Sequence, residues 1–406
     1  MYMTCQVSHF SLLCEYNQRY LYNSDFLPNY FINFKRNPYI KMKTYSFMLL
    51  ALSVLLFASC KSEGEMVPKV YTFTKENVMK TVPANWTKSV DIKLQTSDSV
   101  YFDCSSKMVL NDRDIFVSMY KKPIYHFDKK GQLLNKVGGI GHSKNEYSEV
   151  YDMKLNADTK ELEVLTNGKI IRYDYDGNFK SADNLDIGIV SFLHDKDSYW
   201  LSSGVNTYYS EYEIFKADEH LVVKKKFLNR GLTIPCMSQS FANSPVKTYH
   251  FPFSNDIYHL DAENDTVTLA YTFKFPDMEI PEAFQHGTME DLIHKDENHE
   301  IPDFTEKGCF LESERFIYLP VVEHKKWSGI RFNEGVHTGY HWIIDKKTDK
   351  EIVINIDDMY KNSESYHFRP QLLDENDILY FLGTDVESYK DESVHVIGID
   401  LNKLFE

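Results

Sequence analysis

The amino-acid sequence predicts an all-β protein, a six-bladed β-propeller of four-stranded blades whose ring is closed by an N-terminal strand. Two observations carry this prediction. Turns that contain Asp recur between short apolar strands, and aromatic residues make up 15% of the sequence, with 28 Tyr and 27 Phe. Aromatic side chains fit the pleated, half-buried surface of a sheet, so the composition favours strands over a helix bundle.

The recurring turns set the number of blades. Successive turns are separated by 46, 44, 43, 84 and 55 residues. Repeats of about 40 to 50 residues with four strands each are typical of propeller blades. The gap of 84 residues has to hold an insertion, which we place at residues 276–307, where the sequence has helical character. The six turns lie at or near Asp128, Asp174, Asp218, Asp261, Asp345 and Asp400.

The second unit shows the blade pattern most clearly. Its four predicted strands cover residues 150–156, 161–165, 169–174 and 179–185. Asn-Gly and Asp-Gly dipeptides separate the later strands, and both tolerate the positive φ that tight hairpin turns need. Four strands joined by three hairpins make one blade.

The last unit, from Phe368 onward, ends too early to contain a fourth strand. The early strand Val90–Leu94 precedes the first unit and has no blade of its own. We therefore expect this strand to become the outermost strand of the last blade, which would close the ring and leave only short edges exposed.

The N-terminal region predicts export. Residues 1–41 are irregular and are interpreted as an over-extended gene start, and residues 42–59 have the form of a signal peptide, with Lys43 followed by the apolar run Phe47–Phe57. Cys60 follows Phe-Ala-Ser, which resembles the lipobox of bacterial lipoproteins and implies lipidation of Cys60. Residues 60–89 then form the lipidated Cys, a tether and a lead-in, and residues 90–406 the propeller.

Charge and cysteine content exclude several classes. The net charge is −15, and the chain from Cys60 onward carries −18, which repels phosphate backbones and argues against nucleic-acid partners. The six cysteines include no CxxC pair, so neither a zinc site nor a disulfide framework is indicated. After Cys60, the remaining Cys104, Cys236 and Cys309 are expected as buried free thiols.

A motif between the first two units points to a family. Gly139, Gly141, Glu146 and Tyr147 match a Gly-x-Gly-Pro-Gly-Glu-Tyr segment, although His142–Asn145 replaces its Pro-Gly portion. The chain resembles the six-bladed β-propeller lipoproteins of Bacteroidetes, in which this segment links the first two blades. The resemblance implies a fold and a location, an outer-membrane lipoprotein that faces the periplasm or the cell surface, but no substrate. Glu146 and Tyr147 are expected to order the inter-blade turn.

A patch on the rim is the predicted ligand site. Trp rings stack on sugar faces, while His and Arg bind hydroxyls or acids, so such a cluster suits a glycan or a peptide. The alternative for the neighbouring Trp342 is packing between blades. The predicted binding residues of this patch are His324, Trp327, Arg331 and His337, and two further ones, His367 and Arg369, are expected on inner strands at the central channel.

Metal chemistry has weaker support. His286, Glu290 and His294 have the i, i+4, i+8 spacing of a helical zinc site, but Gly287 and Thr288 weaken that helix. A calcium site at the central channel needs six or more oxygen ligands, and the inner strands offer few carboxylates. No metal ligands or catalytic residues are assigned, and no cofactor is expected unless calcium binds at the channel.

These observations predict a lipid-anchored module of the cell envelope that binds a glycan, a peptide or an envelope protein without catalysis. The alternative is a calcium-dependent propeller hydrolase or lyase that acts at the central channel. Propellers host both roles on one fold, so the architecture alone does not decide between them.

Overall fold

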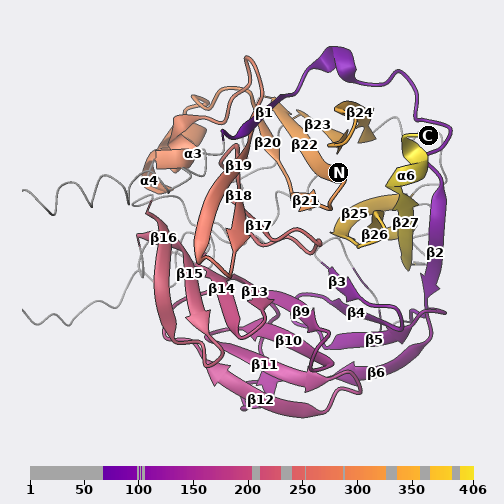
Figure 1. Ribbon diagram of the computed structural model, residues 1–406, viewed down its shortest axis with the longest axis vertical. Helices are drawn as coiled ribbons and strands as arrows, with labels where there is room; N and C mark the ends of the chain where they lie inside the picture. Colours follow the sequence, from indigo (N-terminus) through magenta and orange to yellow (C-terminus); the bar gives the residue numbers. More distant parts are fainter. Residues whose placement is uncertain are drawn as a thin grey trace, which may run out of the picture.

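The structure is a computed structural model. It describes residues 67–97, 100, 102, 106–203, 211–229, 240–251, 253–286, 289–325, 336–356, 366–385 and 394–406. Six sheets stand around a central axis, with the first strand of each blade innermost, which confirms the predicted six-bladed β-propeller (Figure 1).

The blades follow one another along the chain. Blade one contains β3 (Lys107–Leu110), β4 (Asp114–Ser118), β5 (Ile124–Asp128) and β6 (Leu133–Val137). Blade two contains β9 (Asp152–Asn156), β10 (Glu161–Thr166), β11 (Lys169–Asp174) and β12 (Phe179–Asn184). Blade three contains β13 (Ser191–Asp195), β14 (Ser198–Ser202), β15 (Tyr212–Asp218) and β16 (Val223–Asn229). Blade five contains β20 (Phe304–Lys307), β21 (Leu311–Glu312), β22 (Phe316–Lys325), β23 (Val336–Asp345) and β24 (Lys350–Asn355).

Blade six is completed from the other end of the chain. It contains β25 (Tyr366–Leu373), β26 (Ile378–Asp385) and β27 (Val394–Asp400), and its outer strand is β2 (Lys88–Leu94). β2 pairs antiparallel with β27. The ring is therefore closed by the N-terminal strand, as predicted.

Blade four has an additional outer strand. Its sheet contains β17 (Thr248–His250), β18 (Asp256–Asp261) and β19 (Thr266–Lys274). Phe241 bridges Tyr249 on the axial side, so the segment around Phe241 takes the innermost position. On the outer side, β1 (Lys69–Thr72) pairs parallel with β19. The assignment of residues 60–89 to a lead-in outside the propeller is therefore wrong for β1, which is part of blade four.

The N-terminal segment from β1 to β2 crosses the outer edges of three blades (Figure 1). After β1 and the short helix η2 (Lys75–Asn77), Val78 bridges Val353 of β24, and the Met79 N–H donates to the Val353 carbonyl at 2.8 Å. The segment thus contacts blades four, five and six in turn. We call residues 69–94 the belt.

The recurring Asp side chains form the turns that the sequence predicts. Asp128 Oδ1 accepts hydrogen bonds from the N–H groups of Lys130 and Gln132, both at 2.9 Å, and Asp174 and Asp218 act in the same way in the next two blades. Asp400 instead caps α6 (Leu401–Leu404), because the fourth strand of its blade comes from the belt. Side-chain bonding to nearby backbone N–H groups is why Asp favours these positions.

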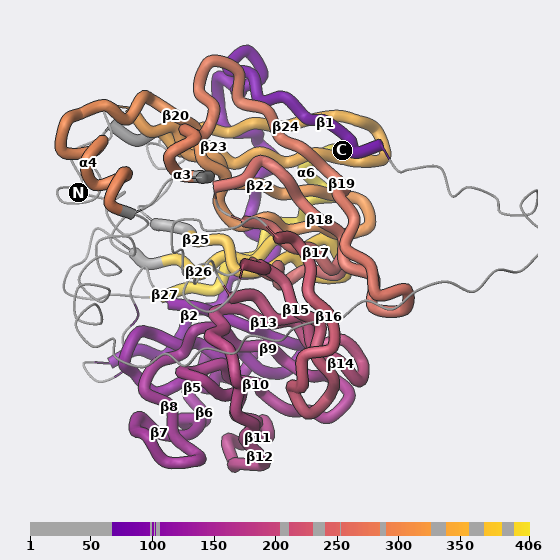
Figure 2. Tube along the Cα trace, turned by 90° about the vertical axis from the view of Figure 1, so that its left-hand side faces the viewer, coloured from indigo at the N-terminus to yellow at the C-terminus, as the bar shows by residue number. Residues whose placement is uncertain are grey.

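Because the strands alternate in direction, these turns share one end of the ring, which we call the turn face. The opposite end, the loop face, holds the connection of residues 138–151 between blades one and two. It also holds the helices α3 (Glu282–His286) and α4 (Met289–Glu297) (Figure 2, left). The loop face therefore carries longer connections between strands than the turn face does.

The insertion is shorter than predicted and contains two helices. Residues 304–307 form β20 of blade five, so the insertion ends before them. His286 belongs to α3, whereas Glu290 and His294 belong to α4, so the three do not share one continuous helical face. The helices dock through a cluster that comprises Phe251, Phe253, Ile280, Ala283, Phe284, Leu292, Ile301 and Phe304.

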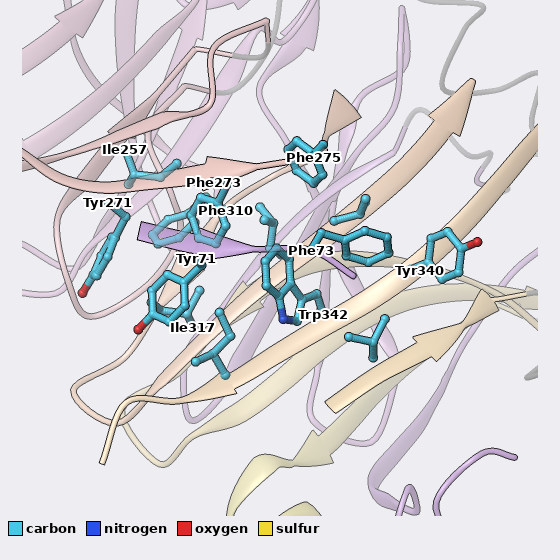
Figure 3. Close-up of a cluster of buried hydrophobic side chains, with 14 residues drawn as sticks. Tyr71, Phe73, Ile257, Tyr271, Phe273, Phe275, Phe310, Ile317, Tyr340 and Trp342 are labelled. Atoms are coloured by element: carbon cyan, nitrogen blue, oxygen red, sulfur yellow. The ribbon is translucent and has the colours of Figure 1, made fainter. Parts of the chain in front are cut away.

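Aromatic side chains fill the spaces between blades. In the largest such cluster, Trp342 of blade five lies edge-on to Phe273 of blade four, with ring centroids 5.4 Å apart (Figure 3). Tyr71 and Phe73 of the belt complete this cluster. The belt therefore contributes to the core as well as to the outer edge.

The belt also enters the space between blades five and six. Trp86 stacks on His341 at 5.6 Å between ring centroids, and Phe381 lies 5.7 Å from the same imidazole. His341 is buried, and its Nδ1 lies 2.7 Å from the Tyr318 hydroxyl. Burial lowers the pKa of His341 to about 3, so the folded protein keeps this imidazole neutral.

His341 should make the protein sensitive to acid. Below about pH 6.5 the unfolded chain protonates this imidazole and the folded chain does not, so the free energy of unfolding falls by up to about 1.4 kcal/mol per pH unit until about pH 3. We expect His341→Phe to lose less stability than the wild type between pH 6.5 and 4.5 in urea denaturation. The exposed-residue control, His220→Gln, should follow the wild type, and equal acid slopes in all three proteins would contradict the assignment.

Candidate functional site

The connection between blades one and two is built on Tyr147. The short strands β7 (Gly139–Ile140) and β8 (Glu146–Tyr147) pair in parallel. The buried Tyr147 hydroxyl accepts a hydrogen bond from the Ile124 N–H at 2.7 Å and donates one to the Val137 carbonyl at 2.6 Å. Tyr147 thus ties the connection to blade one, a structural role.

Gly141 and Glu146 set the shape of the same connection. Glu146 Oε2 accepts a hydrogen bond from the Ser143 N–H at 3.0 Å, and this bond is the main cause of the lowered pKa of Glu146. A Cβ at Gly141 would lie 2.1 Å from Glu146 Oε2, so a larger residue would displace the carboxylate. The loop therefore holds a defined form although His142–Asn145 replaces the Pro-Gly portion of the motif.

This connection forms one wall of a pocket on the loop face. The pocket has a volume of about 430 Å³, within the size range of small-molecule sites. Its second wall is blade two, at the turn between β10 and β11 and at the end of β12. The lining residues are Gly141, His142, Lys144, Glu146 and Ser148 from the connection, and Thr166, Asn167, Lys169, Ala182 and Asn184 from blade two.

Hydrogen bonds fix the cationic part of the pocket. The Lys169 ammonium donates to the Ser143 carbonyl at 2.7 Å and to the Lys144 carbonyl at 3.4 Å, and burial lowers its pKa. The Lys144 ammonium lies 5.9 Å from the centroid of the Phe179 ring. Thr166 is buried, and its hydroxyl has no hydrogen-bond partner in the described part of the chain. The pocket therefore combines two ammonium groups and a carboxylate with amides and hydroxyls.

At the axis of the propeller, the Asp152 carboxylate already pairs with the Lys154 ammonium at 3.7 Å. Lys154 of β9 reaches across to blade four, where its ammonium contacts the Phe241 carbonyl at 3.3 Å and Asn243 Oδ1. The buried Asp152 Oδ2 already accepts from the Ser191 hydroxyl at 2.8 Å and the Phe192 N–H at 3.2 Å. No group of three or more His, Cys, Asp or Glu suited to a metal occurs among the described residues.

The predicted rim residues do not form one described patch. His324 and His337 are cross-strand partners on β22 and β23. A binding role on the rim needs an exposed His324, but this residue is buried, since it stacks on Phe304 at 4.6 Å and contacts Glu306 at 3.2 Å. Trp342 packs between blades four and five, which is the alternative to ligand binding given for it in the sequence analysis.

For the other predicted binding residues, a role in ligand binding stays a prediction. Trp327 and Arg331 lie outside the described residues, and His337 and His367 lie on β23 and β25 without described side chains. Arg369 is half-buried on the innermost strand of blade six. The structure thus has Arg369 on an inner strand, where the sequence analysis expects it.

Cys309 is half-buried with a free thiol, and desolvation raises its pKa to about 11, which disfavours the reactive thiolate. Cys104 and Cys236 lie outside the described residues, as does Cys60.

Sequence reasoning missed the pocket. The sequence indicates only a hairpin turn at Asn167 and only a loop at Lys144. Nothing in their spacing shows that the connection folds back against the β10–β11 turn. The available signal was Gly141 with Glu146, since a constrained loop on the loop face is a common location for a site.

Comparisons with solved structures agree with the fold. A protein from Bacteroides fragilis named as exported has a structure with a TM-score of 0.63 at 16% identity, over 81% of this chain and 99% of that one. A DUF4221 family member from Bacteroides vulgatus has a TM-score of 0.50 at 9% identity, over 77% and 96%. At these identities the likeness shows the fold alone.

The search of proteins with curated function finds no match. Within the described residues, no helix is long and apolar enough to cross a membrane. The family described as "Domain of unknown function (DUF4934)" matches residues 76–399, which is most of the chain. The chain therefore belongs to the DUF4934 family.

Proposed function

We propose that this protein is a non-catalytic binding module of the cell envelope, and that its ligand occupies the pocket between blades one and two. The observation that carries the proposal is the pocket itself, a cavity of about 430 Å³ whose polar groups converge from two separate parts of the chain. Pockets with a few fixed polar groups are the usual form of a ligand site.

The lining indicates the class of ligand. Lys144 and Lys169 provide positive charge, and Glu146 provides a single carboxylate. Asn167, Asn184 and the Thr166 hydroxyl offer hydrogen bonds that suit sugar hydroxyls. We propose an acidic sugar as the ligand, whose carboxylate the ammonium groups would bind.

A hydrolase or lyase has less support. Catalysis needs an acid, a base or a metal held at one place. The pocket's candidates for acid or base include His142, Glu146 and Lys169, but Glu146 already accepts from the Ser143 N–H and Lys169 donates to the Ser143 carbonyl. At the axis, Lys154 and Asp152 are engaged by neighbouring groups. The pocket therefore favours binding over turnover.

The proposed lipid anchor at Cys60 determines which face of the propeller lies toward the membrane. Eight residues separate Cys60 from Lys69, so the tether spans at most about 30 Å. The Lys69 ammonium pairs with Asp349, which lies in the β23–β24 turn on the turn face. We propose that the turn face lies toward the outer membrane and that the pocket on the loop face points away from it.

The pocket proposal predicts selective binding. We expect the purified protein to bind galacturonate more tightly than galactose in isothermal titration calorimetry, because the two sugars differ in the acid group. Lys169→Gln should weaken galacturonate binding at least about tenfold, as expected for loss of a charge-assisted bond of about 1.5 kcal/mol or more.

The matched control is Lys180→Gln, a charge removal on β12 of the same blade outside the pocket lining. It should bind like the wild type. Equal binding of both sugars, or equal weakening in the two variants, would contradict the proposed ligand class.

The anchor proposal is tested in membranes. Cys60→Ala should move the protein from the membrane fraction to the soluble fraction, because the acyl chains would be lost. Unchanged membrane association would refute lipidation.

The direction of the anchored protein has its own test. A dye on Asp176→Cys, in the β11–β12 turn of the turn face, should transfer energy to a lipid headgroup acceptor more efficiently than a dye on Asn167→Cys at the pocket. The unmodified protein measures background labelling of native cysteines. Stronger transfer from position 167 would reverse the proposed direction.

A further inference from the structure

We infer that the pocket recognises the end of an acidic glycan, and that the Thr166 hydroxyl selects for a free hydroxyl group on the terminal sugar. This selectivity rests on the proposed function, the binding of an acidic sugar, and specifies which part of a glycan is bound. The position of Thr166, the packing beneath it and the row of side chains that leads outward from it support this assignment.

Thr166 is the deepest polar group of the pocket. Among the described residues that line the pocket, Thr166 is the only buried one, with 1% of its surface exposed. Its hydroxyl oxygen has no hydrogen-bond partner in the described part of the chain. A hydroxyl offers one donor and two acceptor positions. A desolvated hydroxyl is costly to leave unpaired, so a hydroxyl group of the ligand would satisfy it.

A row of side chains leads from Thr166 to the surface. In the ladders of blade two, Thr166 pairs with Lys169, and Lys169 pairs with Asn184. Opposite residues of an antiparallel ladder point to the same face of the sheet, with Cβ atoms about 5 Å apart. Thr166 is buried, Lys169 is half-buried and Asn184 is exposed. The pocket therefore deepens inward, from the outer strand β12 toward β10.

The hydrophobic core closes the pocket beneath Thr166. Val164 and Ile171, each two residues nearer the turn face, form the next row on the same side of the sheet. Both are fully buried in the cluster between blades one and two. On β12 the same row has Ala182, which is half-buried and lines the pocket. A ligand that reaches Thr166 therefore ends there, and its remainder leaves outward along β12.

Acid and hydroxyl recognition fit one sugar unit. The Lys169 ammonium bonds to the Ser143 carbonyl on the opposite wall at 2.7 Å. An acid group at this ammonium and a hydroxyl group at the neighbouring Thr166 lie within the span of one uronic acid ring. The hydroxyl bound to Thr166 has to be free, because a glycosidic bond there would place the next sugar in the space that Val164 and Ile171 fill. The pocket thus suits the terminal unit of a glycan rather than an internal one.

Oligogalacturonates of different length test the recognition of an end. We expect calorimetry with trigalacturonate and with a long polygalacturonate of defined length to give one protein molecule bound per chain in both cases, because each chain has one end of the kind that fits. A site for internal units would bind several protein molecules to the long chain, and that stoichiometry would contradict the inference.

Variants of Thr166 test the hydroxyl contact. Thr166→Val keeps the shape of the side chain and should weaken galacturonate binding about tenfold, whereas Thr166→Ser keeps the hydroxyl and should bind like the wild type. The matched control is Thr248→Val in blade four, because Thr248 is also buried, its hydroxyl also lacks a partner among the described residues, and it does not line the pocket. Neither Val variant should lower the melting temperature, since Val replaces a hydroxyl without a partner.

Deoxy sugars identify the group that Thr166 binds. One of the monodeoxy forms of galacturonate should bind the wild type about tenfold more weakly than galacturonate does. Thr166→Val should bind that form and galacturonate equally, because the hydroxyl contact is then absent from both complexes.

The outcomes separate this inference from the proposed function. Equal galacturonate binding by the wild type and Thr166→Val would overturn the inference and leave the proposed function standing. Equal weakening in Thr248→Val would overturn the assignment to Thr166. An absence of binding of galacturonate and its oligomers to the wild type would overturn both proposals.

Discussion

The antiparallel pairing of β2 with β27 is the interaction on which the ring depends. It joins residues about 300 positions apart and gives blade six its outer strand. Without it, β27 would expose an unpaired edge, and the hydrophobic cluster between blades six and one would lose Val90, Ile92 and Leu94 of β2. The belt extends this closure over blades four and five, where Phe73 and Trp86 enter the core.

The fold could be predicted because its signals are local. Asp128, Asp174 and Asp218 bond their own turns, and these bonds need only residues two to four positions away. β1 could not be predicted, since four residues with one buried position carry no periodic signal and their partner β19 is distant in sequence. The pocket could not be predicted for the same reason, because Lys169 contacts Ser143 only after blade two has folded.

The pocket and the axis share one physical feature despite the net charge of −15. Both hold lysines whose ammonium groups bond to backbone carbonyls, Lys169 to Ser143 and Lys107 to Tyr151. A carbonyl positions an ammonium without neutralising it. Each lysine also has a carboxylate near it, Glu146 near Lys169 and Asp152 near Lys107, and the charge of that carboxylate opposes the lowering of the pKa by burial.

Because an N-terminal strand completes the last blade, the ring can close only after the other strands of that blade have been made. The partner of β2 is formed by residues 394–400, near the end of the chain. A chain still emerging from a ribosome or a translocation pore therefore holds β2 without its partner and has open edges at both ends of its partial ring. Such edges pair readily with other chains, so the interval before the last residues emerge is the period of greatest exposure to aggregation.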